Sequence, residues 1–554
     1  MRGFQPAIAT ALRNYRRSDF FADVGAGLTV GIIALPLAIG FGIASGVTPQ
    51  QGLWTGIIAG IVVSLLGGSR FQIAGPTGAF VPILFSIVIV HGYAGLALAT
   101  MMAGVMLMIL GALRMGGLLK FIPYPVVAGF TSGIAVIIFC GQLNEFLGLG
   151  LQMPSHVPQQ IAALASHLQG INWQAFAIGT LTLGVLYAWP LVTKRVPASI
   201  VAVVLATGVA YAARWPVATI GTRFGGIPAG LPGLHFPEVS LELMRDLMGP
   251  AFTIAALGAI ESLLSAMVAD GMTDTRHDPN QELLAQGLAN VLCPIAGGIT
   301  ATGAIARTAA NIRSGARTPV SGIVHALVLL AAIFLAAPWA GYIPLAALSA
   351  ILLTVAFRMA EWHTFPELWR GPRADFGVLV AAFALTVIFD LTIGVGAGLI
   401  MAAVLFLRQM EEVTHVRLVT EQSEIGTGSD SIRGKDVPPD VILYRIEGPM
   451  FFAAAEKLDM ALRGSGGRPR VVVFRMRSVP AMDSSGLHAF EVAIAKLKRD
   501  DIEIFLTGVQ PQPMKVMFES GLAERIGLDR FCADIDQALA AVRQTDQASV
   551  ARRD

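Results

Sequence analysis

The distribution of apolar residues limits what this chain can fold into more than any other feature. Residues 24–407 are almost continuously apolar with brief polar breaks, whereas residues 408–554 have ordinary polar composition. Over the whole chain 54% of residues are hydrophobic, 14% are charged, and the mean hydropathy is +0.66. This exceeds what a water-soluble core needs, so a lipid bilayer must be the solvent. We predict a membrane domain at residues 1–408, a linker at 409–436 and a soluble domain at 437–545.

The apolar region divides into segments long enough to cross a bilayer. A spanning helix needs about 20 apolar residues, and a polar loop at residues 214–245 separates two sets of seven candidates. The expected spans are residues 24–45, 52–67, 74–90, 94–113, 124–143, 174–190 and 198–213, followed by 249–269, 283–297, 303–313, 319–337, 341–357, 374–390 and 392–408. We therefore expect a polytopic α-helical membrane protein with fourteen spans in two similar halves.

Cationic residues predict the orientation of these spans, because Lys and Arg in short loops concentrate on the cytoplasmic side. Outward connections at residues 46–51, 91–93 and 147–173 contain no Lys or Arg, and the loop 214–245 is the exception. The predicted cytoplasmic cations are Arg13, Arg16, Arg17, Arg70, Arg114, Lys120, Lys194, Arg195, Arg276, Arg313, Arg317, Arg358, Arg370 and Arg373. Both termini are then cytoplasmic, in a bacterial inner (plasma) membrane. Seven spans per half make the halves inverted repeats, which is typical of transporters.

Each half contains a short segment interrupted by Gly or Pro at the corresponding place. The segments are FQIAGPTGAFVPILF at residues 71–85 and GGITATGAIARTAANI at residues 297–312. If each break opens a half-helix near mid-membrane, two helix N-termini face one another and their free N–H groups suit an anion. Thr77 and Thr308 add hydroxyl donors. Gly and Pro are common in membrane helices generally, but the matched placement favours a binding site.

Ionisable residues inside spans are costly and are functional candidates. Glu261 lies mid-span, with Ser265 one turn later on the same face, and Arg307 follows the second break. A carboxyl group removed from water and from cations retains a proton more readily, so we predict that Glu261 and Ser265 couple transport to protons. The alternative is a static Glu261–Arg307 pair, or an Arg307 that attracts substrate. For His325 we favour a hydrogen-bonded packing role over proton relay.

Other function classes find no support in the sequence. There is no P-loop, no metal-ligand cluster and no Ser/His/Asp set in a credible context, so we expect neither an enzyme nor a cofactor or metal. The net charge of +2 gives no case for nucleic acid. Three cysteines cannot supply a disulfide framework. The expected partners are a small anion, a proton and the lipid bilayer.

Four strings carry a resemblance that covers nearly the whole chain. They are GLTVGIIALPLAIGFGIASG (residues 27–46), AGPTGAF (74–80), GAIESLLSAMVADGMT (258–273) and NQELLAQGLANVLCPIAGGITATGAIARTAANIRSGA (280–316). They resemble the sulfate permease (SulP) family. The resemblance implies a core domain that moves against a gate domain, an anion site between the third and tenth spans, and commonly a homodimer. It implies binding roles for Phe41, Thr77, Gly78 and the run Ala306, Arg307 and Thr308.

Departures from the family pattern shape the coupling hypothesis. Sodium-coupled bicarbonate carriers of the family have Asp at the position of Glu261 and a hydroxyl where Ile305 stands, and many eukaryotic members have Gln at the position of Leu37. The strings look closest to bacterial C4-dicarboxylate members. We therefore predict proton symport of a small anion such as a C4-dicarboxylate, sulfate or bicarbonate. The alternatives are an uncoupled or sodium-coupled exchanger or carrier, or a membrane-anchored sensor or scaffold.

The polar tail alternates strands with a helix. Strands are expected at residues 441–448, 471–477 and 502–509, and a helix at 484–500 opens on the sequence DSSG at 483–486. This resembles the α/β STAS domain that these transporters share with bacterial anti-sigma-factor antagonists. The resemblance marks Ser484 or Ser485 as possible regulatory phosphorylation sites and implies regulation or a cytoplasmic protein partner. A plain helix N-cap made by Asp483 or a serine is the alternative reading.

Overall fold

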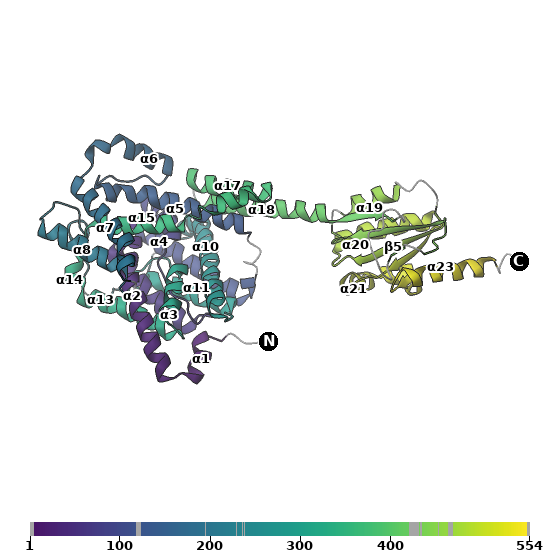
Figure 1. The fold of residues 1–554 in the computed structure, drawn as a ribbon, viewed down its shortest axis with the longest axis horizontal. Helices are drawn as coiled ribbons and strands as arrows, with labels where there is room; N and C mark the ends of the chain where they lie inside the picture. Colours follow the sequence, from purple (N-terminus) through teal and green to yellow (C-terminus); the bar gives the residue numbers. More distant parts are fainter. Residues whose placement is uncertain are drawn as a thin grey trace. The chain divides into compact units, whose positions relative to one another are not determined.

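The computed structural model divides into two compact units, residues 1–402 and 403–554. It describes residues 5–117, 123–193, 196–228, 230–234, 236–237, 239–389, 391–419, 431–432, 435–451, 454–463 and 469–550. Figure 1 shows a helical unit and a smaller α/β unit. The predicted cytoplasmic cations Lys120, Lys194 and Arg195 lie outside the described residues.

The larger unit is a bundle of apolar helices. In its described first half these are α2 (Arg17–Ala44), α3 (Pro49–Leu66), α4 (Val81–Ala112), α5 (Tyr124–Leu147), α7 (Trp173–Val192) and α8 (Ala198–Ala212). The second half contains α10 (Leu241–Thr273), α11 (Pro279–Ile295), α12 (Ile305–Arg313), α13 (Val320–Leu335), α15 (Leu345–Met359), α17 (Arg373–Ile388) and α18 (Leu391–Val413). Short helices connect them: α1 (Ala7–Ala11), α6 (Val157–Ser166), α9 (Ile220–Phe224), α14 (Ala337–Ala340) and α16 (Thr364–Trp369).

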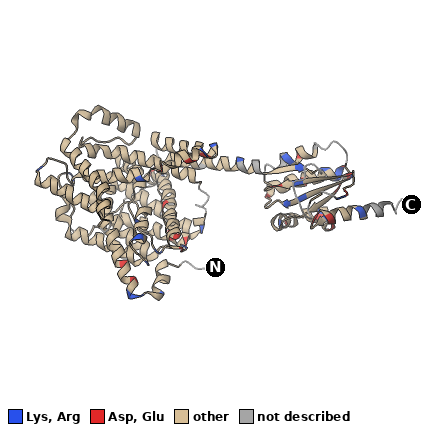
Figure 2. Ribbon diagram, in the orientation of Figure 1, with Lys and Arg blue, Asp and Glu red and all other residues tan. Residues whose placement is uncertain are grey.

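These helices confirm a polytopic helical membrane fold. Among the described residues, 7 helices are long and apolar enough to cross a membrane, and shorter apolar helices such as α8 and α13 accompany them. Helix α4 changes direction at Gly92, whose φ of 65° and ψ of −170° are not helical. It therefore supplies both the third and the fourth expected span. Charged residues are sparse over this unit in Figure 2.

Small residues let the helices approach closely, as in other membrane bundles. A Cβ at Gly287 on α11 would lie 2.6 Å from the Gly104 carbonyl oxygen on α4. A Cβ at Gly31 on α2 would lie 2.6 Å from Val328 Cβ on α13. Side chains larger than hydrogen at these positions would force the helices apart.

Two very short strands pair inside the bundle and position the candidate site. We call this strand pair the crossing. Strand β1 (Ala74–Gly75) pairs antiparallel with β2 (Thr302–Gly303), with Ala74 opposite Gly303 and Gly75 opposite Thr302. The Ala304 amide extends the pair by donating to the Ile73 carbonyl oxygen at 2.9 Å. The third and tenth expected spans each begin with such a strand. The crossing therefore joins the two halves at their corresponding breaks.

The smaller unit contains a sheet of order β3-β4-β5-β6-β7 among its described residues. The strands are β3 (His415–Leu418), β4 (Val441–Glu447), β5 (Val471–Ser478), β6 (Glu503–Thr507) and β7 (Phe531–Cys532); β3 is antiparallel to β4, and the other neighbours are parallel. Its helices are α19 (Ala454–Arg463), α20 (Ser484–Arg499), α21 (Pro511–Glu519), α22 (Leu522–Ile526) and α23 (Ile535–Val550).

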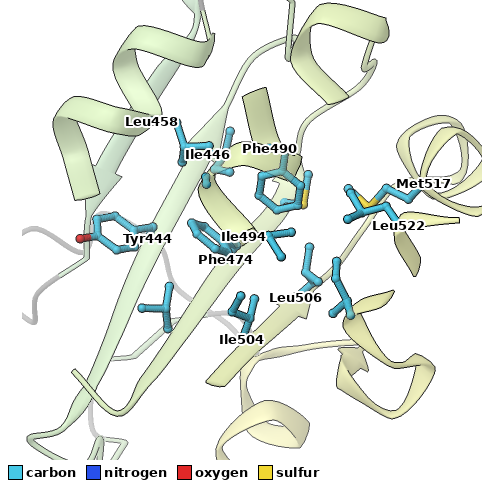
Figure 3. Packing of buried hydrophobic residues seen from close by; sticks show 14 of the residues in the cluster. Tyr444, Ile446, Leu458, Phe474, Phe490, Ile494, Ile504, Leu506, Met517 and Leu522 are labelled. Carbon is cyan, nitrogen blue, oxygen red and sulfur yellow. The ribbon is translucent and has the colours of Figure 1, made fainter. Parts of the chain in front are cut away.

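Apolar side chains cover both faces of this sheet. On one face Tyr444, Phe474 and Phe490 form the centre of a core that includes α20 and α21 (Figure 3). On the other face Phe505 packs with Leu539 of α23. The parallel strands are buried on both sides, which explains their continuous apolar runs.

Candidate functional site

The strand crossing brings two helix N-termini together. Beyond β1 the chain enters the 3-10 turn η2 (Gly78–Phe80), which leads into α4, and beyond β2 it enters α12. Thr77 and Ala304 are the N-cap residues, and neither side chain caps its helix. The first N–H groups of a helix have no partner within it, and its N-terminus carries partial positive charge. The crossing therefore presents donors and positive dipole ends at one place.

The predicted binding residues differ in how open they are. Ala306 is exposed and Thr77 is half-buried, and the Thr77 hydroxyl has no hydrogen-bond partner among the described residues. Phe41 is 5% exposed, and its ring packs against Gly78, where a Cβ would lie 3.2 Å from Phe41 Cε1. Phe41 and Gly78 are thus in contact, while Ala306 and Thr77 are the more open of the predicted binding residues.

Arg307 places a cation behind the crossing. Its side chain is buried at 3% exposure, and its Nη2 donates to the Pro76 carbonyl oxygen at 2.6 Å. Its Nη1 has no hydrogen-bond partner in the described chain. If residue 75 had a Cβ, that atom would lie only 2.7 Å from this Nη1. Glycine at 75 therefore makes room for the guanidinium, which lies against β1.

Hydroxyl groups of α10 hold the crossing in place. Ser262 Oγ and Thr302 Oγ1 are 2.6 Å apart, and Ser265 Oγ donates to Thr308 Oγ1 at 3.1 Å. Thr308 Oγ1 also accepts the Ile73 amide at 3.1 Å. The Ser265 and Thr308 hydroxyls thus tie α10, β1 and α12 together, and Thr308 is turned toward this scaffold.

Glu261 lies on α10 beside Ser262 in the sequence. Its side chain has no hydrogen-bond or ion-pair partner among the described residues. Its side chain is 9% exposed, and its carboxylate forms no hydrogen bond or ion pair with any described residue. The alternative of a static Glu261–Arg307 pair is therefore absent from this structure. A buried carboxyl without a cation beside it is suited to carrying a proton.

His325 on α13 is fully buried at 0% exposure. The Gly322 carbonyl, one turn earlier, interacts with the ring. Neither ring nitrogen reaches a partner within hydrogen-bonding geometry in the described chain. His325 is thus buried as expected of a packing histidine, and its ring lies near the Gly322 carbonyl without a well-formed hydrogen bond to any described residue.

Two supporting residues, Gln72 and Glu282, were not identified from the sequence. Gln72 Nε2 donates to the Ser262 carbonyl oxygen at 3.0 Å. Glu282 on α11 is fully buried and accepts the Gly68 and Ser69 amides at 2.9 and 3.2 Å. The sequence did contain a signal for both residues, since each is a polar side chain beside an apolar span. A buried polar group needs hydrogen-bond partners, so such residues tend to fix the packing of the helices.

The predicted regulatory serines lie at the start of α20. Ser484 and Ser485 are exposed, while Asp483 Oδ1 accepts the Gly486 amide at 2.7 Å and caps the helix. The N-cap reading is therefore realised by Asp483, which leaves both serine hydroxyls accessible. The described residues contain no group of three or more His, Cys, Asp or Glu side chains that could hold a metal ion.

Comparisons with known proteins agree with this arrangement. The model of the sulfate permease family matches residues 20–382, and that of the STAS domain matches residues 435–538. The putative sulfate transporter YvdB of Bacillus subtilis is 41% identical over 523 residues, covering 94% of this chain and 97% of that protein. The bicarbonate transporter BicA of Picosynechococcus is 32% identical over 538 residues, covering 93% and 94%.

A solved structure shares the fold over nearly the whole chain. The murine Slc26a9 anion transporter in its inward-facing state aligns with a TM-score of 0.86 at 17% identity, covering 98% of this chain and 94% of that one. YvdB and BicA carry the names of a putative sulfate transporter and a bicarbonate transporter. Neither name supports the expected closeness to C4-dicarboxylate members.

Proposed function

This chain belongs to the sulfate permease family, and on that premise we propose that it is a proton-coupled symporter of sulfate or bicarbonate. The family is one of transporters and not of enzymes. The coarser statement, a secondary anion transporter with a STAS domain, follows from membership and fold. Our proposal concerns the identity of the substrate and of the coupling ion.

The observation that supports an anion most directly is the β1–β2 crossing. It holds the N-termini of η2 and α12 side by side, with the Arg307 cation packed against Gly75 behind them. Backbone donors and dipole ends recognise charge more than shape, so a small, compact anion fits. The substrate names come from YvdB and BicA.

The proposal of proton coupling rests on Glu261, whose carboxylate forms no ion pair with a described residue. The carboxylate is buried and unpaired among the described residues, and it lies on α10, whose Ser262 and Ser265 hold β2 and α12. A proton gained or lost at Glu261 changes charge next to the anion site. Symport follows if the protonated carboxyl favours anion binding.

The experiment is uptake into liposomes that contain the purified full-length protein. Labelled sulfate, bicarbonate, succinate and chloride are each offered with an inward proton gradient, an inward sodium gradient or no gradient. Wild type is compared with Glu261→Gln. The matched control is Glu242→Gln, which alters an exposed carboxylate in the first turn of the same helix.

We expect proton-stimulated uptake of sulfate or bicarbonate that Glu261→Gln loses and Glu242→Gln keeps. Gradient-independent uptake that survives Glu261→Gln would instead identify an uncoupled exchanger, and stimulation by sodium alone a sodium-coupled carrier. Selective uptake of succinate would restore the dicarboxylate hypothesis. A correctly folded protein that transports none of the four anions would favour the sensor or scaffold.

A further inference from the structure

We propose that an anionic phospholipid binds in a two-part cavity between α8 and the α2–α13 pair, with an acyl chain in its apolar part and its phosphate at Arg214. This site is separate from the anion site and does not depend on the proposed function. It also gives a role to Arg214, one of the arginines of the loop 214–245 that depart from the predicted charge distribution.

The apolar part has a volume of 630 Å³, which is within the range of cavities that hold small ligands. Helix α8 contributes Val203 and Val204, α2 contributes Leu35, and α13 contributes Ile333. Val204 is 60% exposed in the isolated chain. Because these are membrane helices, the medium that reaches this cavity is lipid, and an apolar chain is the occupant that the lining suits.

The second part has a volume of 970 Å³, and its lining of mixed polarity includes Arg214. The two parts share the wall residues Tyr211, Ile227, Ala337 and Tyr342, so one elongated molecule can occupy both. The Arg214 side chain is exposed and forms no hydrogen bond or ion pair within the described chain. A guanidinium is a strong phosphate ligand.

Nearby Arg223 behaves differently. Its Nη1 contacts Glu145 Oε1 at 3.0 Å, so its charge is already paired. Arg214 is therefore the arginine available to a headgroup.

Along one face of α8 the side chains change from apolar to charged, as a phospholipid does from its acyl chains to its headgroup. Val203 and Val204 are followed one turn later by Thr207, then by Tyr211, and then by Arg214 beyond the end of the helix. Thr207 lines the apolar part, with its hydroxyl oxygen buried. The ten helical residues from Val203 to Ala212 span about 15 Å, close to one leaflet's hydrocarbon layer.

Exposed aromatic side chains mark the junction between the two parts. Tyr211, Trp339 and Tyr342 are 68%, 69% and 52% exposed, and the rings of Tyr211 and Tyr342 meet edge-on at 5.4 Å. Tyr and Trp gather at the headgroup level of membranes. This places the junction where the glycerol backbone of a bound lipid would lie.

The test is native mass spectrometry of the detergent-purified full chain with equal amounts of phosphatidylglycerol and phosphatidylethanolamine. We expect wild type to retain phosphatidylglycerol preferentially, and Arg214→Gln to weaken its binding about 10-fold or more, as expected for loss of a charged hydrogen bond. Arg245→Gln is the matched control, because Arg245 is exposed near the start of α10 and lines neither part.

A second variant tests the acyl part without disturbing the fold. Gly208 lines the apolar cavity, and a Cβ there meets no atom within 4 Å. Gly208→Leu should therefore fill the cavity and reduce phosphatidylglycerol binding, whereas Gly184→Leu, at another open helical glycine, should leave it unchanged. All variants must elute from gel filtration as wild type does.

Three outcomes would overturn the proposal. These are equal retention of phosphatidylethanolamine, unchanged phosphatidylglycerol binding in Arg214→Gln or Gly208→Leu, and absence of bound lipid from wild type. A parallel thermal-unfolding series uses inorganic phosphate without lipid. Protection by phosphate alone that equals the protection by phosphatidylglycerol would identify a free-anion site and also overturn the proposal.

Discussion

Ser265 on α10 donates a hydrogen bond to Thr308 on α12, with 3.1 Å between the two hydroxyl oxygens, and both side chains are fully buried. The helix that carries Glu261 is thus bonded directly to the half-helix that opens the candidate anion site. A change of charge at Glu261 lies one helical turn from this bond. The pair offers a physical link between proton binding and the position of α12.

Removal of this bond should lower stability through a measurable coupling. Ser265→Ala should cost about 1 kcal/mol, as for a typical buried hydrogen bond, and Thr308→Val should cost more because it also leaves the Ile73 amide unpaired. A double-mutant cycle by chemical denaturation in detergent should give an interaction energy of about 1 kcal/mol. Ser86→Ala is the control, since its hydroxyl bonds only within α4. Additive single-mutant effects would exclude the coupling.

A buried carboxylate fastens the start of α2 to the loop before α13. Asp23 is fully buried, and it accepts the Arg317 amide at 2.7 Å, the Thr318 hydroxyl at 2.5 Å and the Tyr15 hydroxyl at 3.1 Å. Burial, followed by the negative charge of Asp23, raises the pKa of Tyr15 from 10.0 to about 12. The phenol must therefore remain protonated to keep this contact.

Tyr15 should make stability depend on alkaline pH. Because its folded pKa exceeds its unfolded pKa, its stabilisation is fully present below about pH 10 and is lost as pH rises toward 12. The stability difference between wild type and Tyr15→Phe should accordingly narrow between pH 10 and 12. Tyr187→Phe, at an exposed tyrosine, controls for the other titrating groups. A difference that stays constant over this range would contradict the prediction.

The first turn of α20 requires glycine at position 486, because the Met450 backbone packs against it. A Cβ at Gly486 would lie 1.9 Å from the Met450 carbonyl oxygen. Gly486→Ala should destabilise the STAS domain by about 1–3 kcal/mol through overpacking, and Asp483→Ala should cost about 1 kcal/mol through loss of the N-cap. Ser485→Ala at an exposed position should change stability by less than about 0.5 kcal/mol. The rate of limited proteolysis of the full chain reports the stability of this domain in each variant. Equal cleavage rates for all three variants would contradict the predicted order of stabilities.

Local patterns in the sequence predicted the fold and the two breaks at which the candidate site lies. The Gly and Pro breaks near Gly75 and Gly303 indicated two half-helices, because they stand at corresponding places in the two halves and both residue types disfavour a continuous helix. Which groups face the opening was not predictable. The Pro76 carbonyl accepts Arg307 from 231 residues away, and the Thr308 hydroxyl is turned to Ser265. Both contacts depend on how the two halves pack, which no spacing along the chain encodes.

Gly75 lies at the centre of this packing, and its substitution is the most direct test of the site's geometry. Its φ of +153° disfavours other residues, and an added Cβ would lie 2.7 Å from Arg307 Nη1 and 3.2 Å from Gly56 Cα. Gly75→Ala should therefore displace the guanidinium and lower anion uptake about 10-fold or more, equivalent to about 1.4 kcal/mol. Gly141→Ala on α5 is the control, since its Cβ meets no atom within 4 Å. Uptake by Gly75→Ala at the wild-type rate would show that the Arg307 position behind β1 is not required for transport.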